Sequence, residues 1–172
     1  DKTALLYKLV NNGSYYFLSR PRRFGKSLLI STLESYFSGR KELFKGLAIE
    51  NMEKDWTEYQ ILHLDLNTAK YDCTEALLNV LNDSLANWEV LYGTSSTEVT
   101  PELRFKGIIR RAFEKTGQRV VILVDEYDKP MLQAIGNMEL QDSYRNILKA
   151  FYSVLKTQDR YIRFALLTGV TK

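Results

Sequence analysis

The sequence predicts an α/β fold in which one parallel sheet carries helices on both faces. Short apolar segments at 15–18, 61–67, 120–124 and 162–167 have the composition of strands, and stretches with helical spacing separate them. The segment 120–124 is entirely aliphatic, which is typical of a strand buried on both faces. Strands that alternate with helices favour a parallel arrangement, because each return to the same edge of the sheet needs a crossover.

Signals for helix ends place the helical stretches. Asn11-Asn12-Gly13 is typical of a helix end, and Thr100-Pro101 combines a capping threonine with a proline suited to the first turn. The helices are expected at 3–11, 27–37, 74–91 and 101–116, in a short stretch after Pro130, and at 140–157.

Composition limits the class of protein. The 172 residues suit one domain, and 45% hydrophobic with 26% charged residues is ordinary for a globular chain. A net charge of +3 is too small to indicate nucleic-acid binding by itself. One cysteine excludes an internal disulfide, so we expect a cytoplasmic protein, and one histidine argues against a zinc site built from histidines. No apolar run has the length of a membrane span.

The strongest local motif is RPRRFGKS, which runs from Arg20 to Ser27 between a predicted strand and a predicted helix. Free N–H groups at a helix start and the helix dipole attract phosphate. Gly25 lets the backbone approach closely, Lys26 can reach the terminal phosphates, and Ser27 can offer its hydroxyl to magnesium. The usual loop has glycine where this chain has Arg20. The motif predicts a variant P-loop, and the alternative is a basic surface loop before a helix.

A second motif lies where Asp125 and Glu126 follow the strand 120–124. Ligands of open parallel sheets bind at the carboxyl ends of strands, so this motif and the basic loop point to one edge. We expect Asp125 to hold magnesium through water and Glu126 to orient or deprotonate the water that attacks the γ-phosphate. Thr168, at the end of the last strand, is expected to touch the γ-phosphate or that water. The alternative for these acids is a helix cap or a solvated turn, and we favour the cap for Asp128.

Three stretches resemble bacterial AAA-ATPase-like proteins: FLSRPRRFGKS at 17–27, VDEYDKP at 124–130 and LLTGV at 166–170. The resemblance covers nearly the whole chain and implies a P-loop NTPase fold of the ASCE type, with ATP and Mg²⁺ as cofactors. It also implies that arginine at position 20 is the usual residue. Such proteins often carry a PD-(D/E)XK nuclease-like domain on the C-terminal side, which does not fit within these residues.

The motifs, together with the resemblance, lead to the following expected roles of the site residues. Those expected to bind nucleotide are Arg20, Pro21, Arg22, Arg23, Phe24, Gly25, Lys26, Ser27 and Leu28. Those expected to act in catalysis are Glu126, Lys26 and Thr168, and those expected at the metal are Ser27 and Asp125.

By analogy with P-loop domains, the strands are expected in the order 61–67, 120–124, 162–167, 15–18. The analogy also implies a fifth strand beyond 15–18, and without it the strand 15–18 would have an uncovered edge. We therefore expect the chain to be a fragment of a longer protein, with the fifth strand outside it.

Two other functions stay open. A non-hydrolysing nucleotide switch or interaction module is one, because Arg20 replaces the usual glycine. A nucleic-acid-binding module that uses the basic loop on backbone phosphates is the other.

Two further groups of polar residues are expected to be structural. For Arg104 and Arg111, on the helix 101–116 with Lys106 and Arg110, we expect a solvated face. A nucleic-acid patch, or an arginine finger offered within a homo-oligomer, is the alternative. For His63 and Asp65 we expect a solvated or helix-covered strand face rather than a catalytic pair.

Overall fold

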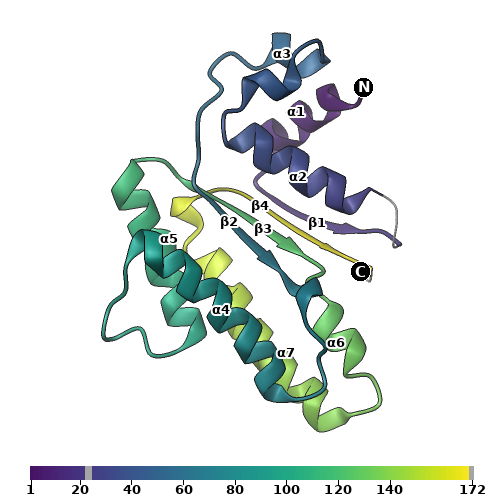
Figure 1. Ribbon diagram of the computed structural model, residues 1–172, viewed down its shortest axis with the longest axis vertical. Helices are drawn as coiled ribbons and strands as arrows, with labels where there is room; N and C mark the ends of the chain where they lie inside the picture. Colours follow the sequence, from purple (N-terminus) through teal and green to yellow (C-terminus); the bar gives the residue numbers. More distant parts are fainter. Residues whose placement is uncertain (22–24, 171–172) are drawn as a thin grey trace.

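One parallel sheet organises the molecule. The computed structural model describes residues 1–21 and 25–170. The strands pair in the order β1-β4-β3-β2, and all three pairings are parallel, which confirms the predicted order (Figure 1). The strands are β1 (Tyr15–Ser19), β2 (Ile61–Asp65), β3 (Val120–Asp125) and β4 (Ile162–Gly169).

The predicted helices are all present. The α-helices are α1 (Thr3–Asn12), α2 (Lys26–Phe37), α3 (Ala48–Met52), α4 (Thr74–Tyr92), α5 (Pro101–Thr116), α6 (Lys129–Gln133) and α7 (Met138–Thr157). Short 3-10 turns are η1 (Lys41–Phe44), η2 (Leu66–Thr68) and η3 (Asp159–Tyr161). As predicted, the Thr100 side chain caps α5 by accepting from the backbone N–H of Leu103. No element was predicted between residues 40 and 60, where η1 and α3 lie.

Strand β2 is two residues shorter than predicted. The Asp65 carboxylate accepts a hydrogen bond from the N–H of Asn67 at 2.8 Å, and the chain turns into η2. An aspartate that binds the backbone two residues ahead competes with the ladder of a strand. The turn brings Asn67 to the carboxyl edge of the sheet instead of leaving it on the strand.

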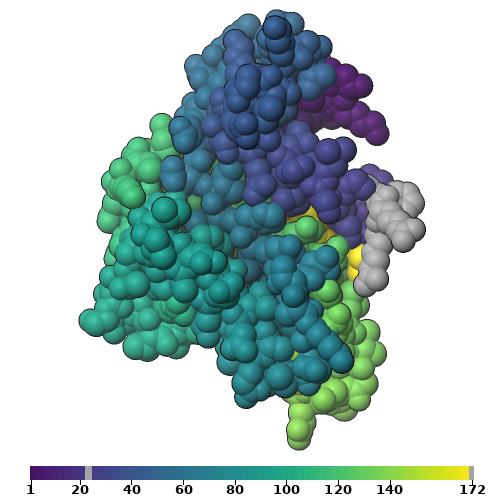
Figure 2. All heavy atoms as spheres, viewed as in Figure 1, coloured from purple at the N-terminus to yellow at the C-terminus, as the bar shows by residue number. Residues whose placement is uncertain are grey.

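Helices cover both faces of the sheet, as expected for this class. On one face, α1 and α2 pack against Val121 and Leu123 of β3. On the other, α4, α5 and α7 pack against Ile122 and Val124. Figure 1 shows these two helical layers on opposite sides of the strands. In the space-filling view the purple-to-blue segments, α1 to α3, gather at one end, and α4 and α5 form much of the other (Figure 2). The aliphatic run of β3 therefore lies at the centre of two cores.

The polar face of β2 is partly covered by a helix, and its residues His63 and Asp65 are half-buried. Leu62 and Leu64 are buried, and His63 and Asp65 alternate with them. The Nδ1 atom of His63 lies 2.8 Å from Oε1 of Glu34 on α2. This contact agrees with the expected structural role for His63, because it ties the edge strand to the helix that follows the basic loop.

Two arginines of α5 are engaged in ion pairs and do not form the solvated face that we expected. Arg104 contacts Glu89 of α4, with Nη2 and Oε1 2.5 Å apart. Arg111 contacts Glu98 through both terminal nitrogens, at 2.6 and 2.8 Å. These hydrogen bonds hold the pKa of Glu98 below its usual value, against the opposing effect of burial. The expectation failed because the partner carboxylates belong to another helix and a loop.

Within residues 1–21 and 25–170, no helix combines the length and the apolar composition needed to cross a membrane.

Candidate functional site

The carboxyl ends of the strands bring the two sequence motifs together. Ser19, the last residue of β1, is in register with Gly169 of β4, and Val124 of β3 is in register with Leu167. The basic loop that follows β1 and the acidic turn that follows β3 therefore flank the end of β4. In Figure 1 the strands point toward α6 and the start of α2. This is the edge at which the sequence predicted a ligand site.

The helix α2 begins directly after a glycine in a left-handed conformation. Gly25 has φ 80° and ψ 15°, a region in which a side chain is costly. Its carbonyl accepts from the N–H of Leu29, which starts the helical ladder. Ser27 and Leu28 are exposed on the first turn. The residues Arg22, Arg23 and Phe24, which we expected to contact nucleotide, lie outside the described residues, whereas Arg20 and Pro21 lie within them and are exposed.

Lys26 is buried and held by several contacts. Only 5% of it is exposed, on the inner face of α2 together with Ile30. Its Nζ donates to the carbonyl oxygens of Arg20, at 3.0 Å, and Gly169, at 3.2 Å. The same Nζ lies 3.4 Å from Oε1 of Glu126. The lysine of the loop and the glutamate of the acidic turn are thus in direct contact, 100 positions apart in the chain.

A threonine at the end of β4 contacts the acidic turn through both its side chain and its backbone. Thr168 is fully buried and donates its hydroxyl to Oδ1 of Asp125 at 2.7 Å. The N–H of Glu126 lies 3.4 Å from the same hydroxyl oxygen, and the N–H of Tyr127 donates to the Thr168 carbonyl at 2.8 Å. We expected this hydroxyl to reach the γ-phosphate or the attacking water. In the structure it faces the backbone and carboxylate of the acidic turn.

A second carboxylate binds the same strand end. Asp128 is buried, and its Oδ2 accepts from the N–H of Val170 at 3.0 Å. It occupies the N-cap position of α6, as predicted, but its side chain makes no capping hydrogen bond there. Between these contacts Gly169 has no room for a side chain, because an added Cβ would lie 2.5 Å from Tyr127 and 2.6 Å from Asp128. The acidic turn and the end of β4 therefore form one close-packed unit.

A polar cavity of about 550 Å³ opens at this edge. It is lined by Gly25, Lys26, Ser27, Leu28, Asn67, Glu126, Lys129 and Gln133. Five of these were predicted for nucleotide binding or catalysis, and the cavity brings them together. Asp125 and Thr168 do not line the cavity, and Thr168 contacts both Asp125 and the backbone of Glu126.

Three lining residues were not predicted: Asn67, Lys129 and Gln133. The Nζ of Lys129 donates to both oxygens of Asn67, the carbonyl at 3.1 Å and the side-chain amide at 2.8 Å. Gln133 uses its Oε1 to accept from the N–H of Tyr71. Lys129 stands three residues after Glu126 in the same motif, which was an available signal. The position of Asn67 depends on the early end of β2 and had no signal in the sequence.

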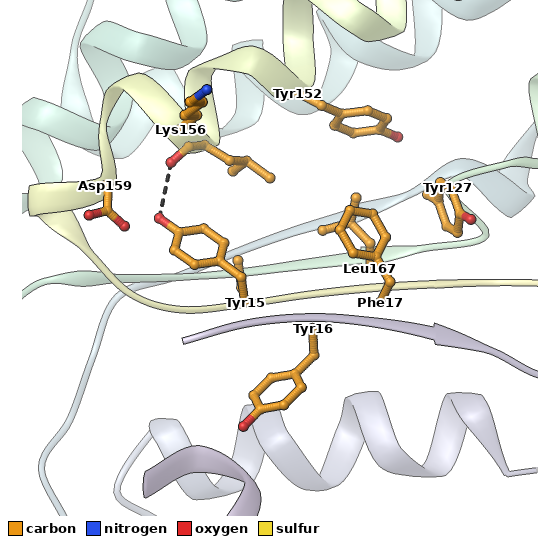
Figure 3. Close-up of a pocket in the computed structure, with 10 residues that line it drawn as sticks. Tyr15, Tyr16, Phe17, Tyr127, Tyr152, Lys156, Asp159 and Leu167 are labelled. Atoms are coloured by element: carbon orange, nitrogen blue, oxygen red, sulfur yellow. Dashed lines mark hydrogen bonds between the residues drawn. The ribbon is translucent and has the colours of Figure 1, made fainter. Parts of the chain in front are cut away.

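A second cavity, of about 520 Å³, lies away from these residues beside the outer edge of β1. Figure 3 shows Tyr15 and Phe17 pointing toward α7, with Tyr16 on the opposite face. The Tyr15 hydroxyl donates to the Leu155 carbonyl at 3.0 Å, and burial raises the pKa of this phenol. The lining is mostly apolar and aromatic, and Phe17 is 71% exposed. The charged side chains in this lining are Lys156 and Asp159, so the chemistry of this cavity differs from that of the polar cavity.

The polar cavity has the donor types that Mg²⁺ takes. Ser27 supplies a hydroxyl and Glu126 a carboxylate at the cavity, with Asp125 adjacent through the hydrogen bonds of the acidic turn. Magnesium keeps most of its waters and needs only one or two protein oxygens beside those of a nucleotide. No cluster of three or more His, Cys, Asp or Glu side chains that could hold a metal ion occurs in the described part of the chain. The oxygen donors present fit a nucleotide-borne magnesium ion.

A parallel sheet whose carboxyl edge joins a glycine-lysine-serine helix start to an acidic strand end defines a P-loop-like α/β domain, a class that binds nucleotide phosphates. Comparison with known proteins agrees with this class. The family model described as "Predicted AAA-ATPase" matches residues 1–172, so the chain belongs to the AAA-ATPase-like family. A curated relative, the "Uncharacterized protein in vnfD 5'region" of Azotobacter chroococcum mcd 1, is 39% identical over 173 residues. The match covers all of this chain and 33% of that relative.

Proposed function

We propose that the chain binds ATP at the polar cavity and hydrolyses it with Mg²⁺. The observation that carries the proposal is the contact between Lys26 and Glu126, which joins the loop motif to the acidic motif at one cavity. A phosphate chain placed there would meet the free amides at the start of α2 and the Lys26 ammonium. Membership of an ATPase-like family supports ATP as the nucleotide.

Each residue has a distinct part in this proposal. Lys26 turns from Glu126 to the terminal phosphates, because a phosphate carries more negative charge than one carboxylate. The freed Glu126 then orients the attacking water and accepts its proton. Bound magnesium would neutralise charge on the phosphate oxygens, with Ser27 and Asp125 as the residues that hold it, Asp125 through water.

Thr168 serves as a positioning residue in this proposal. Its hydroxyl contacts both the Asp125 carboxylate and the backbone N–H of Glu126, so it fixes the orientation of the two acidic residues. A side chain that contacts a metal-binding or catalytic residue in this way orients it without touching the substrate. The expected effect of its loss is therefore on turnover more than on affinity.

Two substitutions test the proposal in the full-length protein. Lys26→Ala is expected to abolish ATP binding measured by calorimetry, and Glu126→Gln is expected to keep binding and lose turnover. Lys106→Ala, on the exposed face of α5, is the matched control. If the two variants kept the wild-type ATPase rate, the proposal would be wrong.

The same measurements separate the other functions. Tight ATP binding by the wild type without turnover would identify a nucleotide switch instead of an ATPase. Affinity for nucleic acid that falls steeply with salt, with no ATP binding, would identify the basic loop as a nucleic-acid contact, because such contacts release counterions.

We further propose that a strand from elsewhere in a longer protein pairs with the outer edge of β1. Among the residues that the structure describes, β1 pairs only with β4, and Tyr15 and Phe17 are exposed beside the apolar cavity. An uncovered edge with aromatic side chains needs protection from other chains. The chain spans a third of the length of its curated relative, so residues are available for this strand there. The nuclease-like domain expected from the resemblance belongs to the same proposal.

A further inference from the structure

A lysine that does not belong to the phosphate loop, Lys129, lines the same polar cavity as the loop residues. Lys129, the first residue of α6, lines the polar cavity together with Lys26 and Glu126. The charges of the two lysines are compensated differently. Lys26 is paired with the Glu126 carboxylate at 3.4 Å. Within residues 1–21 and 25–170, Lys129 makes no ion pair, and its Nζ contacts two neutral oxygens of Asn67. Lys129 therefore keeps a positive charge available to an anion in the cavity.

The backbone around Lys129 is closely tied to the acidic turn. The N–H of Lys129 donates to the carbonyl of Glu126 at 3.1 Å, and the next turn continues with the N–H of Leu132 on the carbonyl of Asp128 at 3.0 Å. Pro130 follows at the start of α6, where its fixed φ suits a helix start. The backbone therefore fixes the position of Lys129 relative to Glu126, and the Lys129 side chain extends from this fixed point to Asn67.

Asn67, the partner of Lys129, is also held in place by a hydrogen bond. The N–H of Asn67 donates to the Asp65 carboxylate at 2.8 Å, which sets the turn after β2. Asn67 then offers both its carbonyl and its side-chain amide oxygen to the ammonium of Lys129. Neutral acceptors orient an ammonium without cancelling its charge, whereas a carboxylate would cancel it.

We propose that Lys129 is a second cationic contact for the terminal phosphate of a bound nucleoside triphosphate, with Asn67 as the residue that aims it. This inference rests on the proposed ATPase function. Glu126 places the attacking water beside the terminal phosphate in that function, and Lys129 is anchored to Glu126 by the backbone. Charge that develops on the phosphate oxygens in the transition state is stabilised by fixed cations, and Lys129 supplies one from within the same chain.

The test compares triphosphate with diphosphate in the full-length protein. For Lys129→Met, the dissociation constant for Mg-ATP is expected to rise about tenfold to a hundredfold and that for Mg-ADP to stay near wild type. The kcat is expected to fall about a hundredfold. Lys129→Arg is expected to restore part of both losses, and Asn67→Ala to lower kcat with a smaller effect on affinity. Lys106→Met, on the exposed face of α5, is the control for charge alone.

The outcomes separate this inference from the proposed function. If Lys26→Ala abolished ATP binding while Lys129→Met kept both the wild-type ratio of ATP to ADP affinity and the wild-type kcat, the Lys129 inference would be overturned and the ATPase function would stand. Equal weakening of ATP and ADP, with faster hydrogen exchange in α6, would make Lys129 only a structural tie to Asn67 and would also overturn it. Absence of ATP binding by the wild-type protein would overturn both.

Discussion

Replacing Thr168 with valine removes one hydroxyl and leaves a side chain of nearly the same shape. The hydroxyl donates to the Asp125 carboxylate at 2.7 Å, and the N–H of Glu126 lies 3.4 Å from it. A hydrogen bond to a charged acceptor contributes roughly 1.5–3 kcal/mol. Because Asp125 is only half-buried and can take water instead, we expect a loss of about 2 kcal/mol in local stability. That corresponds to about a thirtyfold increase in the equilibrium constant for local opening.

Hydrogen exchange of β3 and β4 peptides in the full-length protein measures this change directly. Thr157→Val is the control, because Thr157 is exposed at the end of α7 and its hydroxyl bonds only locally, to the Val154 carbonyl and the Gln158 side chain. ATP affinity is expected to stay within about threefold of the wild type while turnover falls, because Thr168 does not line the cavity. Unchanged exchange in β3 and β4 together with a large loss of ATP affinity would refute the reasoning and restore direct contact with the phosphate.

Two other substitutions follow from close packing and from charge. Gly169→Ala is expected to destabilise the protein by about 1–3 kcal/mol, because the new Cβ would meet Tyr127 and Asp128 at 2.5 and 2.6 Å. Unaltered hydrogen exchange in β4 would contradict this expectation. Glu98→Gln is expected to cost about 2 kcal/mol near neutral pH, because it leaves Arg111 without its carboxylate. Since the pKa of Glu98 is lowered, its stabilisation is present above the usual glutamate pKa and is lost as pH falls through the lowered value. Stability measured against pH should show this acid loss in the wild type and a smaller one in the variant.

The strands and the two motifs could be predicted because each depends on local patterns, whereas the strand order was predicted from the analogy with P-loop domains. The aliphatic run of β3 indicates a central strand, and the glycine before Lys26 indicates a tight helix start. Both motifs follow strands, so the parallel sheet brings them to one edge without any knowledge of side-chain packing.

The contacts inside the site could not be predicted in the same way. The contacts of Asp128 with Val170 and of Lys129 with Asn67 join segments far apart in the chain, and no periodicity marks such partners. The burial of Thr168 is a further case, because a threonine at a strand end gives no sign of which neighbour its hydroxyl meets. The expected solvated face around Arg111 failed for the same reason: its partner carboxylate belongs to the loop between α4 and α5.

The backbone at Glu126 bears on how this protein can change over evolutionary time or by engineering. Glu126 has φ 57°, a left-handed conformation that costs a residue with a side chain about 1–2 kcal/mol. Glycine would relieve this cost, but it would also leave the buried Lys26 without its carboxylate partner. Removing one partner of a buried ion pair costs about 3–5 kcal/mol, which is more than the backbone strain. The contact with Lys26 therefore keeps a carboxylate at this strained position, and a variant with glycine there should melt at a lower temperature.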